Sequence, residues 1–305
     1  EILSKATYDL LILVGDSYQI ASIRFGNWFS LARAFLPTAS VFELQKLYRS
    51  SSKGLLTLWD RVRRMESSIL EGLARYGYSA ALDETIFSPV ENDEIILCLN
   101  YDGLYGINNI NRFLQESNPM PAVQWKMQSY KVNDPILFNE ASRFAPVIYN
   151  NMKGHIVYIE ILDAGELTER IQFDIELERA IEEVEVDDLT FLNHSGCGNT
   201  MIRFCVTRGE TDDDDSPPMA VVPFQVAYAI SIHKAQGLEY DSVKIVISDE
   251  VDEQITHNVF YTAITRARKK LKIYWTPEVE KKVLERIKPQ DITKDEVLLR
   301  VLGQD

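Results

Sequence analysis

The chain has 305 residues, 46% hydrophobic and 26% charged, which is ordinary for a soluble globular protein of about two domains. It contains no run of 18 apolar residues and no basic, apolar leader, so we expect no membrane span, no secretory signal and a cytoplasmic location. Cys98, Cys197 and Cys205 lack the spacing of zinc ligands, so we expect reduced thiols and no metal site built from this chain.

The net charge of −14 taken alone argues against nucleic-acid binding, because contacts to phosphates need Lys and Arg. The charge is uneven, however. Residues 176–188 and 212–215 are strongly acidic, and residues 266–272 are basic. Because the local sign decides what a surface attracts, a basic surface for nucleic acid remains compatible with the sequence.

The first 130 residues alternate short apolar runs with helical patterns, which favours a parallel α/β sheet. Residues 9–15 read DLLILVG, which is typical of a buried parallel strand entering a loop. In chain order the predicted elements are a strand at 11–14, a helix at 29–35 that Pro37 ends, a strand at 41–44, a helix at 50–75, a strand at 95–99 and a helix at 106–116.

From about residue 129 the pattern changes to short β-like segments separated by Gly, Asn and acidic turns, which predicts a small barrel or sandwich. The predicted strands are 132–138, 147–149, 155–162, 170–175 and 201–206. The α/β pattern then resumes, so we expect an α/β domain interrupted by an inserted β module. The later predicted elements are a helix-like turn at 233–237, a strand at 243–248, a helix at 258–268, a strand at 272–275 and a C-terminal helix at 278–302.

Four segments carry chemistry. The first places Gly15 and Asp16 at the end of a predicted strand, with the Gln19 amide three residues later. An amide there can sense a terminal phosphate or orient a water at the sheet edge. A plain strand-to-loop turn capped by Asp16 is the alternative interpretation.

In the second segment, Arg49 precedes a predicted helix start at Ser50 or Ser51. A guanidinium in this position can meet a phosphate across a domain cleft. An exposed or ion-paired arginine is the alternative.

The third segment, AISIHKAQGLEY at residues 229–240, concentrates polar groups in a short stretch. Ser231 and His233 suit contacts to a phosphate backbone, and Glu239 suits a hydrogen bond from a ribose hydroxyl. A structural histidine is the alternative for His233.

The fourth segment, YTAITRAR at residues 261–268, predicts a helix with Tyr261, Thr265 and Arg268 on one face and Arg266 on a neighbouring face. An arginine anchored in this way can neutralise charge on a phosphoryl group in transfer. A basic amphipathic helix beside a strand is the alternative.

In this order the four segments resemble motifs III, IV, V and VI of superfamily 1 DNA helicases, within the RecD-like branch (a UvrD/RecD-type C-terminal region). SIHKAQGLEYDSVKIVI and FYTAITRARKKLKIYW are the most specific matches. The resemblance implies a RecA-like parallel-sheet domain with an inserted small SH3-like β-barrel, plus a remnant of the first RecA-like domain. The implied boundaries are 1–40 for the remnant, 41–130 with 220–277 for the second RecA-like domain, 131–219 for the β module and 278–305 for a C-terminal helical segment.

The resemblance also implies roles at the nucleotide. Arg49 and Arg266 would be the two arginines on the γ-phosphate of ATP, and Gln19 would contact that phosphate or the attacking water. Glu239 would lie on the ribose. The implied cofactor-binding set is Gly15, Asp16, Gly237 and Glu239.

Single-stranded DNA is the implied nucleic-acid partner, contacted by Ser231 and His233. Phe25 or Trp28 would stack on a base, which is worth about 1–3 kcal/mol per stack. Core packing is an equal alternative for Trp28.

No GxxxxGK[ST] loop and no strand-end acidic pair before residue 15 is present. We therefore expect the ATP-cradling loop and the Mg²⁺ ligands to belong to a first RecA-like domain outside this chain, and this chain alone to lack ATPase activity. In the intact protein the expectation is ATP-driven translocation and duplex unwinding, 5′ to 3′. The alternatives are a non-catalytic helicase-derived binding or adaptor protein, an RNA helicase, and an unrelated nucleotide-binding α/β enzyme.

Overall fold

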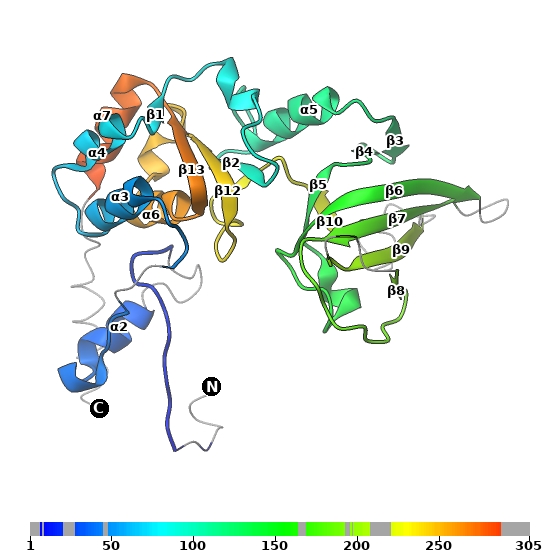
Figure 1. The fold of residues 1–305 in the computed structure, drawn as a ribbon, viewed down its shortest axis with the longest axis horizontal. Helices are drawn as coiled ribbons and strands as arrows, with labels where there is room; N and C mark the ends of the chain where they lie inside the picture. The colour runs from blue at the N-terminus through cyan, green and yellow to red at the C-terminus, as the bar shows by residue number, and fades with distance from the viewer. Residues whose placement is uncertain are drawn as a thin grey trace.

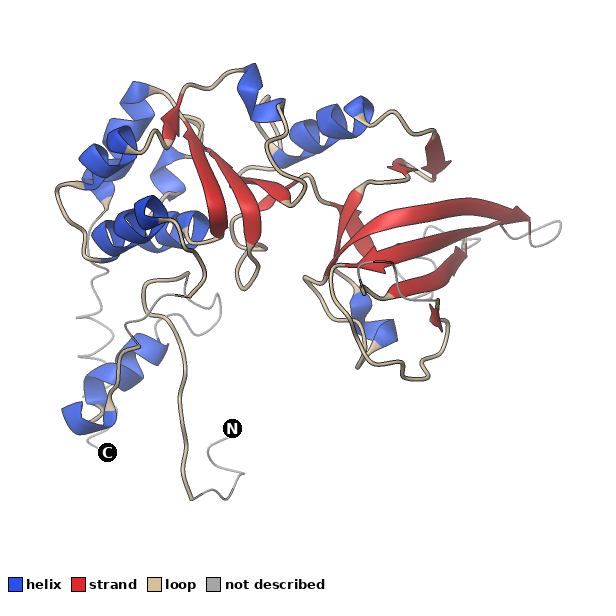
Figure 2. Cartoon of the chain, viewed as in Figure 1, coloured by secondary structure: helices blue, strands red, loops and turns tan. Residues whose placement is uncertain are grey.

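The computed structural model describes residues 7, 9–20, 28–44, 48–163, 169–192, 196, 198–207 and 221–287. A parallel sheet with helices on its faces lies beside a separate antiparallel sheet (Figures 1 and 2). Within these residues no helix has the length and apolar character needed to cross a membrane.

The parallel sheet has five strands in the order β1-β13-β12-β2-β11, and every pairing is parallel. This confirms the mixed α/β class with a parallel sheet. The central strand β2 is a nearly continuous apolar run, and β12 is buried along almost its whole length, as expected where both faces of a sheet are covered. The strands are β1 (Ser79–Ala80), β2 (Glu94–Cys98), β11 (Ala229–Ser231), β12 (Tyr240–Val246) and β13 (Ala267–Tyr274).

Helices cover both faces of this sheet and form a separate hydrophobic core on each face. Alternate residues of β2 point into the two cores. Ile95 and Leu97 join the larger core with α3, α4, α6 and α7, whereas Ile96 and Cys98 join a smaller core with α5. The helices are α3 (Lys53–Arg63), α4 (Ile69–Arg75), α5 (Ile107–Ser117), α6 (His257–Ile264) and α7 (Pro277–Arg286).

The antiparallel sheet has six strands in the order β10-β5-β6-β7-β9-β8 and a core of its own. The order has two ends, β10 and β8, so closure into an SH3-like barrel stays a prediction. A hairpin of β3 and β4 precedes this sheet. The strands are β3 (Ala122–Trp125), β4 (Gln128–Lys131), β5 (Pro135–Phe138), β6 (Lys153–Asp163), β7 (Glu169–Leu177), β8 (Thr190–Phe191), β9 (Met201–Thr207) and β10 (Phe224–Val226).

One predicted strand of this region, 147–149, is wrong. These residues follow a short 3₁₀ helix, η3 (Ala141–Phe144), and form a turn. Val147 and Ile148 are nevertheless buried in the core of the antiparallel sheet, so their apolar character reflects packing rather than strand pairing. The hairpin and β10 lie outside 131–219, and the domain boundaries themselves stay predictions.

The two predicted N-terminal strands are also wrong, although the helix between them, α2 (Trp28–Phe35), is confirmed. Residues 11–14 and 41–44 form no strand. Ile12 and Val14 are 72% and 86% exposed, and Phe42 and Leu44 are 87% and 89% exposed. An apolar run becomes a buried strand only where a neighbouring strand pairs with it, and in the described structure none does.

The predicted helix at 50–75 is two helices, because residues 64–68 turn the chain at Met65, whose φ is 54°. The predicted helix at 258–268 ends at Ile264, where the Thr265 hydroxyl donates back to Tyr261 O at 2.8 Å. The chain then enters β13. Residues 233–237 are turns rather than a helix, and the part of the predicted C-terminal helix beyond residue 287 lies outside the described residues.

Candidate functional site

A short crossover, residues 232–239, places the third predicted segment on one face of the parallel sheet. It leaves β11, whose Ser231 lies opposite Cys98 at the end of β2, and returns to the amino end of β12. Such parallel connections usually need a dozen or more residues. The crossover fits because Ile232 and Ala235 are buried in the larger core and Gly237 has a φ of +86°, where a residue with a Cβ is strained.

Arg49, Glu239 and Arg266 meet at the amino ends of β12 and β13. The Arg49 Nε donates to Glu239 Oε2 at 3.2 Å, and its Nη1 donates to Thr265 O at 2.9 Å. The structure therefore brings together three residues from the second, third and fourth predicted segments.

Arg266 is completely buried, and its donors meet neutral oxygens. Its Nε donates to Thr262 O at 2.9 Å, Nη1 to Leu238 O at 3.0 Å and Nη2 to Thr265 Oγ1 at 3.1 Å. Burial, and after it the nearby positive charge of Arg49, lowers the pKa of Arg266 to about 10. Two guanidinium groups thus lie close together, and among the residues that the structure describes no carboxylate is hydrogen-bonded to Arg266.

The segment of residues 16–20 docks on α6. Ile20 N donates to Thr262 Oγ1 at 3.0 Å, and Asn258 Nδ2 donates to Ser17 O and Gln19 O at 3.1 and 2.9 Å. Gln236 of the crossover donates to Ile20 O at 3.1 Å. The first predicted segment is therefore held against both the third and the fourth.

Within this docked segment Gln19 Nε2 donates to Asp16 Oδ2 at 3.0 Å. The negative charge of Asp16 acts against the lowering of the pKa of Arg266, so the two residues share one electrostatic environment. Gly15 packs on α2, where an added Cβ would lie 2.9 Å from the Phe29 ring.

The predicted nucleic-acid residues occupy different environments. Ser231 is buried, and its Oγ accepts from Lys234 N at 3.2 Å. His233 is exposed in the crossover, so of the two only the histidine offers its side chain to solvent. Phe25 lies outside the described residues, and Trp28 belongs to α2, where its side chain is not described.

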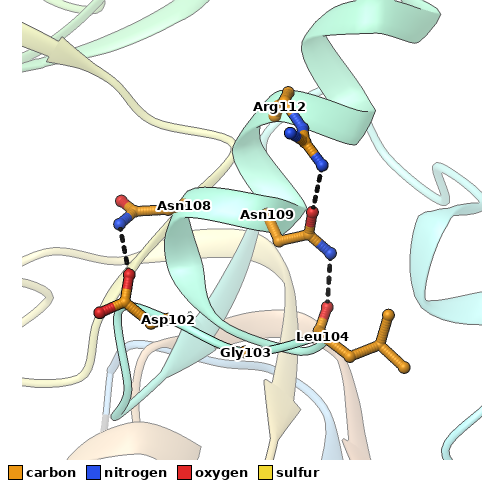
Figure 3. Close-up of a pocket in the computed structure, with 6 residues that line it drawn as sticks. All are labelled: Asp102, Gly103, Leu104, Asn108, Asn109 and Arg112. Carbon is orange, nitrogen blue, oxygen red and sulfur yellow. Dashed lines mark hydrogen bonds between the residues drawn. The ribbon is translucent and has the colours of Figure 1, made fainter.

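A hollow of about 560 Å³, which sequence reasoning missed, is lined by residues that follow β2 in the chain: Asp102, Gly103, Leu104, Asn108, Asn109 and Arg112 (Figure 3). Asn108 Nδ2 donates to Asp102 Oδ1 at 3.2 Å, and Arg112 Nη2 donates to Asn109 Oδ1 at 2.9 Å. The loop is possible only with glycine at 106, where a Cβ would lie 2.3 Å from Asp102 O. The clustered asparagines and glycines of residues 100–109 were the available signal.

Arg268 is not on the helix face predicted with Tyr261 and Thr265, because it lies in β13. It pairs with Asp241, Asp93 and Glu239, with Nη2–Oδ1, Nη2–Oδ2 and Nη1–Oε1 distances of 2.8, 2.7 and 3.5 Å. The Glu239 carboxylate, expected at a ribose, thus lies between Arg49 and Arg268. The sequence signal for this ion-pair network was the position of its acidic residues at the starts of strands. Asp93 precedes β2, Glu239 precedes β12, and Asp241 is the second residue of β12.

In the described part of the chain no three His, Cys, Asp or Glu side chains are grouped so that they could hold a metal ion. The chemistry that this arrangement offers is anion binding. Arg49 and Arg266 can bind a phosphate-bearing ligand once the partly exposed Glu239 carboxylate no longer pairs with Arg49.

Comparison with known proteins finds a family model that is similar to part of this site. Residues 226–274, which include the crossover from residue 232 onward and Arg266, match the model of the UvrD-like helicase C-terminal domain. Over these residues the chain is similar to that domain.

Two curated relatives extend the similarity beyond residues 226–274. RecBCD enzyme subunit RecD of Buchnera aphidicola (Schizaphis graminum) is 26% identical over 184 residues, which are 60% of this chain and 25% of the relative. RecD of Buchnera aphidicola (Acyrthosiphon pisum) is 23% identical over 201 residues, 65% of this chain and 27% of the relative. The chain thus spans about a quarter of the length of these relatives.

The fold of the chain also resembles that of a solved structure. The crystal structure of Pif1 helicase from Candida albicans aligns with a TM-score of 0.51 and 14% identity, covering 93% of this chain and 67% of that one. At this identity the likeness concerns the fold alone. It agrees with the mixed α/β architecture described above.

His257 gives a pH-dependent test of the packing beneath the docked segment. Its Nε2 lies 2.9 Å from Val62 O, and its ring stacks on Tyr261. Burial lowers the pKa of His257 from its ordinary value of 6.5, so the unfolded chain binds its proton more readily. Its contribution to the free energy of unfolding is therefore constant above pH 6.5 and falls as the pH drops below that value.

His257→Gln keeps an N–H donor without a titrating group. We expect urea unfolding between about pH 7 and pH 5 to show a shallower loss of stability in this variant than in the wild type. Equal slopes for the two proteins would show that His257 is not buried in its neutral form.

Proposed function

We propose that this chain is the C-terminal part of an ATP-dependent superfamily 1 DNA helicase, in which Arg49 and Arg266 act on the terminal phosphates of ATP. The observation that carries the proposal is the burial of Arg266 beside Arg49, with only neutral hydrogen-bond acceptors among the described residues. A buried cation that no carboxylate hydrogen-bonds is destabilising, and a second cation nearby raises that cost. A polyphosphate is the ligand chemistry that relieves it.

Guanidinium groups suit this role because their planar donors match phosphate oxygens in pairs. Bound ATP with Mg²⁺ would supply the phosphoryl group that is transferred to water. Arg49 and Arg266 would stabilise the charge on that group, and Gln19 would contact it or the attacking water. Gly15, Asp16, Gly237 and Glu239 would border the nucleotide.

The sequence contains no GxxxxGK[ST] loop, so we propose that a first RecA-like domain supplies the phosphate-cradling loop and the Mg²⁺ ligands. The exposed apolar residues 10–14 support such a neighbour, because a soluble protein rarely leaves a contiguous apolar run in water without a partner. In this proposal the 305-residue chain alone hydrolyses no ATP.

Single-stranded DNA is the proposed track, and translocation runs 5′ to 3′. His233 follows β11 in the chain and the residues that line the hollow follow β2, and the carboxyl ends of these two strands are paired. Their neutral donors and Arg112 suit contacts to a phosphate backbone. The RecD relatives and the fold likeness to Pif1 agree with this assignment in class.

Arg49→Met in the complete helicase should lower the turnover number for ATP by about 10³-fold or more, because it removes charge stabilisation from the transferred phosphoryl group. Arg49 is preferred to Arg266 for the decisive test because the donors of Arg266 also hold Leu238 and Thr262 in place. Arg203→Met is the matched control, since Arg203 pairs with Asp174 in the antiparallel sheet. Equal ATPase rates for the two variants would remove the proposed role.

His233→Ala should weaken binding to single-stranded DNA by about tenfold or less, as expected for one lost hydrogen bond to a phosphate. The matched control is His155→Ala, whose imidazole lies 3.4 Å from Glu176 in the antiparallel sheet. Fluorescence anisotropy at fixed salt measures both. If His155→Ala weakens binding as much as His233→Ala, the crossover is not the contact.

The second candidate is a non-catalytic adaptor derived from a helicase, which the net charge of −14 favours. The helicase and adaptor hypotheses differ in the ATPase activity that they predict. An adaptor binds partners, but the complete protein then turns over no nucleotide. An RNA helicase differs only in its track, which competition between single-stranded DNA and RNA would separate.

A further inference from the structure

A lysine of the antiparallel sheet reaches into the parallel-sheet domain. Lys153 begins β6, and its Nζ lies 2.8 Å from Asp93 Oδ1 and 2.7 Å from Glu178 Oε2. The same Nζ donates to Glu239 O at 3.3 Å and lies 4.1 Å from the centroid of the Tyr240 ring. A β6 side chain therefore contacts the backbone of the residue whose carboxylate holds Arg49.

Two routes of contact lead from Lys153 to Arg49, and both pass through Glu239. The short route runs from the Glu239 carbonyl to its own carboxylate and then to Arg49 Nε at 3.2 Å. The longer route runs through Asp93, whose Oδ2 lies 2.7 Å from Arg268 Nη2, and from Arg268 Nη1 to Glu239 Oε1 at 3.5 Å. Glu239 is thus fixed both at its backbone and at its carboxylate.

Partial burial of this network reduces the solvent screening of its ion pairs and so strengthens them. The side chains of Lys153 and Asp93 are 16% and 21% exposed, whereas isolated surface pairs are far more open and contribute little. Removing the ammonium of Lys153 would leave two carboxylates, Asp93 and Glu178, competing for fewer cations. Arg268 would then be drawn towards Asp93 and away from Glu239.

We propose that Lys153 is a positioning residue through which the antiparallel module sets the location of Glu239, and thereby of Arg49 before nucleotide binds, in the candidate nucleotide site. The proposal rests on the function proposed above. It makes the attachment of the module and the binding of nucleotide energetically coupled, and such coupling is reciprocal. Sequence motifs do not reveal this link, because Lys153 lies outside all four segments.

The test compares three variants of the complete helicase: Lys153→Met, Lys153→Arg and Lys270→Met. Lys270 is the matched control because it lies on β13 and its Nζ is 2.9 Å from Glu91 Oε1, so the same charge is removed from another ion pair. Four quantities are measured: the dissociation constant of a fluorescent ATP analogue, kcat and KM for ATP with single-stranded DNA, and the midpoint of thermal unfolding.

We expect Lys153→Met to lower kcat or weaken nucleotide binding by about five- to tenfold, because small displacements of charge-stabilising groups slow phosphoryl transfer. Lys153→Arg should retain most of the wild-type kcat and nucleotide affinity, and Lys270→Met should match the wild type in both. The unfolding midpoints of the two methionine variants should agree. A purely structural role would instead lower the midpoint and leave kcat and KM per folded molecule unchanged.

The inference fails if Lys153→Met and Lys270→Met have equal kinetic and binding constants. It also fails if the loss in Lys153→Met merely follows a lower unfolding midpoint. Failure of the proposed function has a different signature, since Arg49→Met would then retain full ATPase activity. Loss of activity in Arg49→Met with no effect of Lys153→Met overturns the positioning role alone.

Discussion

The arrangement depends on one costly interaction, the burial of the Arg266 guanidinium beside Arg49, with only neutral hydrogen-bond acceptors in the described structure. Such a cation is tolerated only if fixed surrounding groups accept hydrogen bonds from its nitrogens. Thr262 O and Leu238 O provide this, one from α6 and one from the crossover. The parallel sheet brings these two elements together because β12 and β13 are adjacent.

The same constraint explains why the crossover is short and tightly packed. A longer, mobile connection between β11 and β12 would not hold Leu238 O against Arg266. Burial of Ile232 and Ala235 removes that freedom, and the contact of Gln236 with Ile20 adds the docked segment to the same unit. Glu239 then leaves the crossover where Arg49, Arg268 and Lys153 converge.

The sequence predicted the parts of the fold that local pattern decides. The buried strand β2 and the amphipathic helices α2 and α5 are confirmed, because apolar period and end signals coincide there. Residues 11–14 carry an equally apolar run but pair with no strand in the described structure. The start of β13 was misjudged because a helical reading of TRAR ignores the period of two set by Ala267, Leu271 and Ile273.

The candidate site was foreseen as a set of residues and not as a geometry. Motif order identified Arg49, Glu239 and Arg266, and the structure brings these three together. Motif order could not show that Glu239 accepts a hydrogen bond from Arg49, because that contact joins residues 190 positions apart in sequence. The ion pair between Lys153 and Asp93 could not be predicted from the sequence for the same reason. Ion pairs between domains depend on tertiary structure and leave no local sequence pattern.

The most direct measurement is a structure of the complete protein with ADP, aluminium fluoride and single-stranded DNA, which mimics phosphoryl transfer. The account predicts that the guanidinium of Arg49 leaves Glu239 and, with that of Arg266, contacts the fluoride group. Both arginines remaining in their present contacts, with the fluoride group neutralised by other residues, would contradict it.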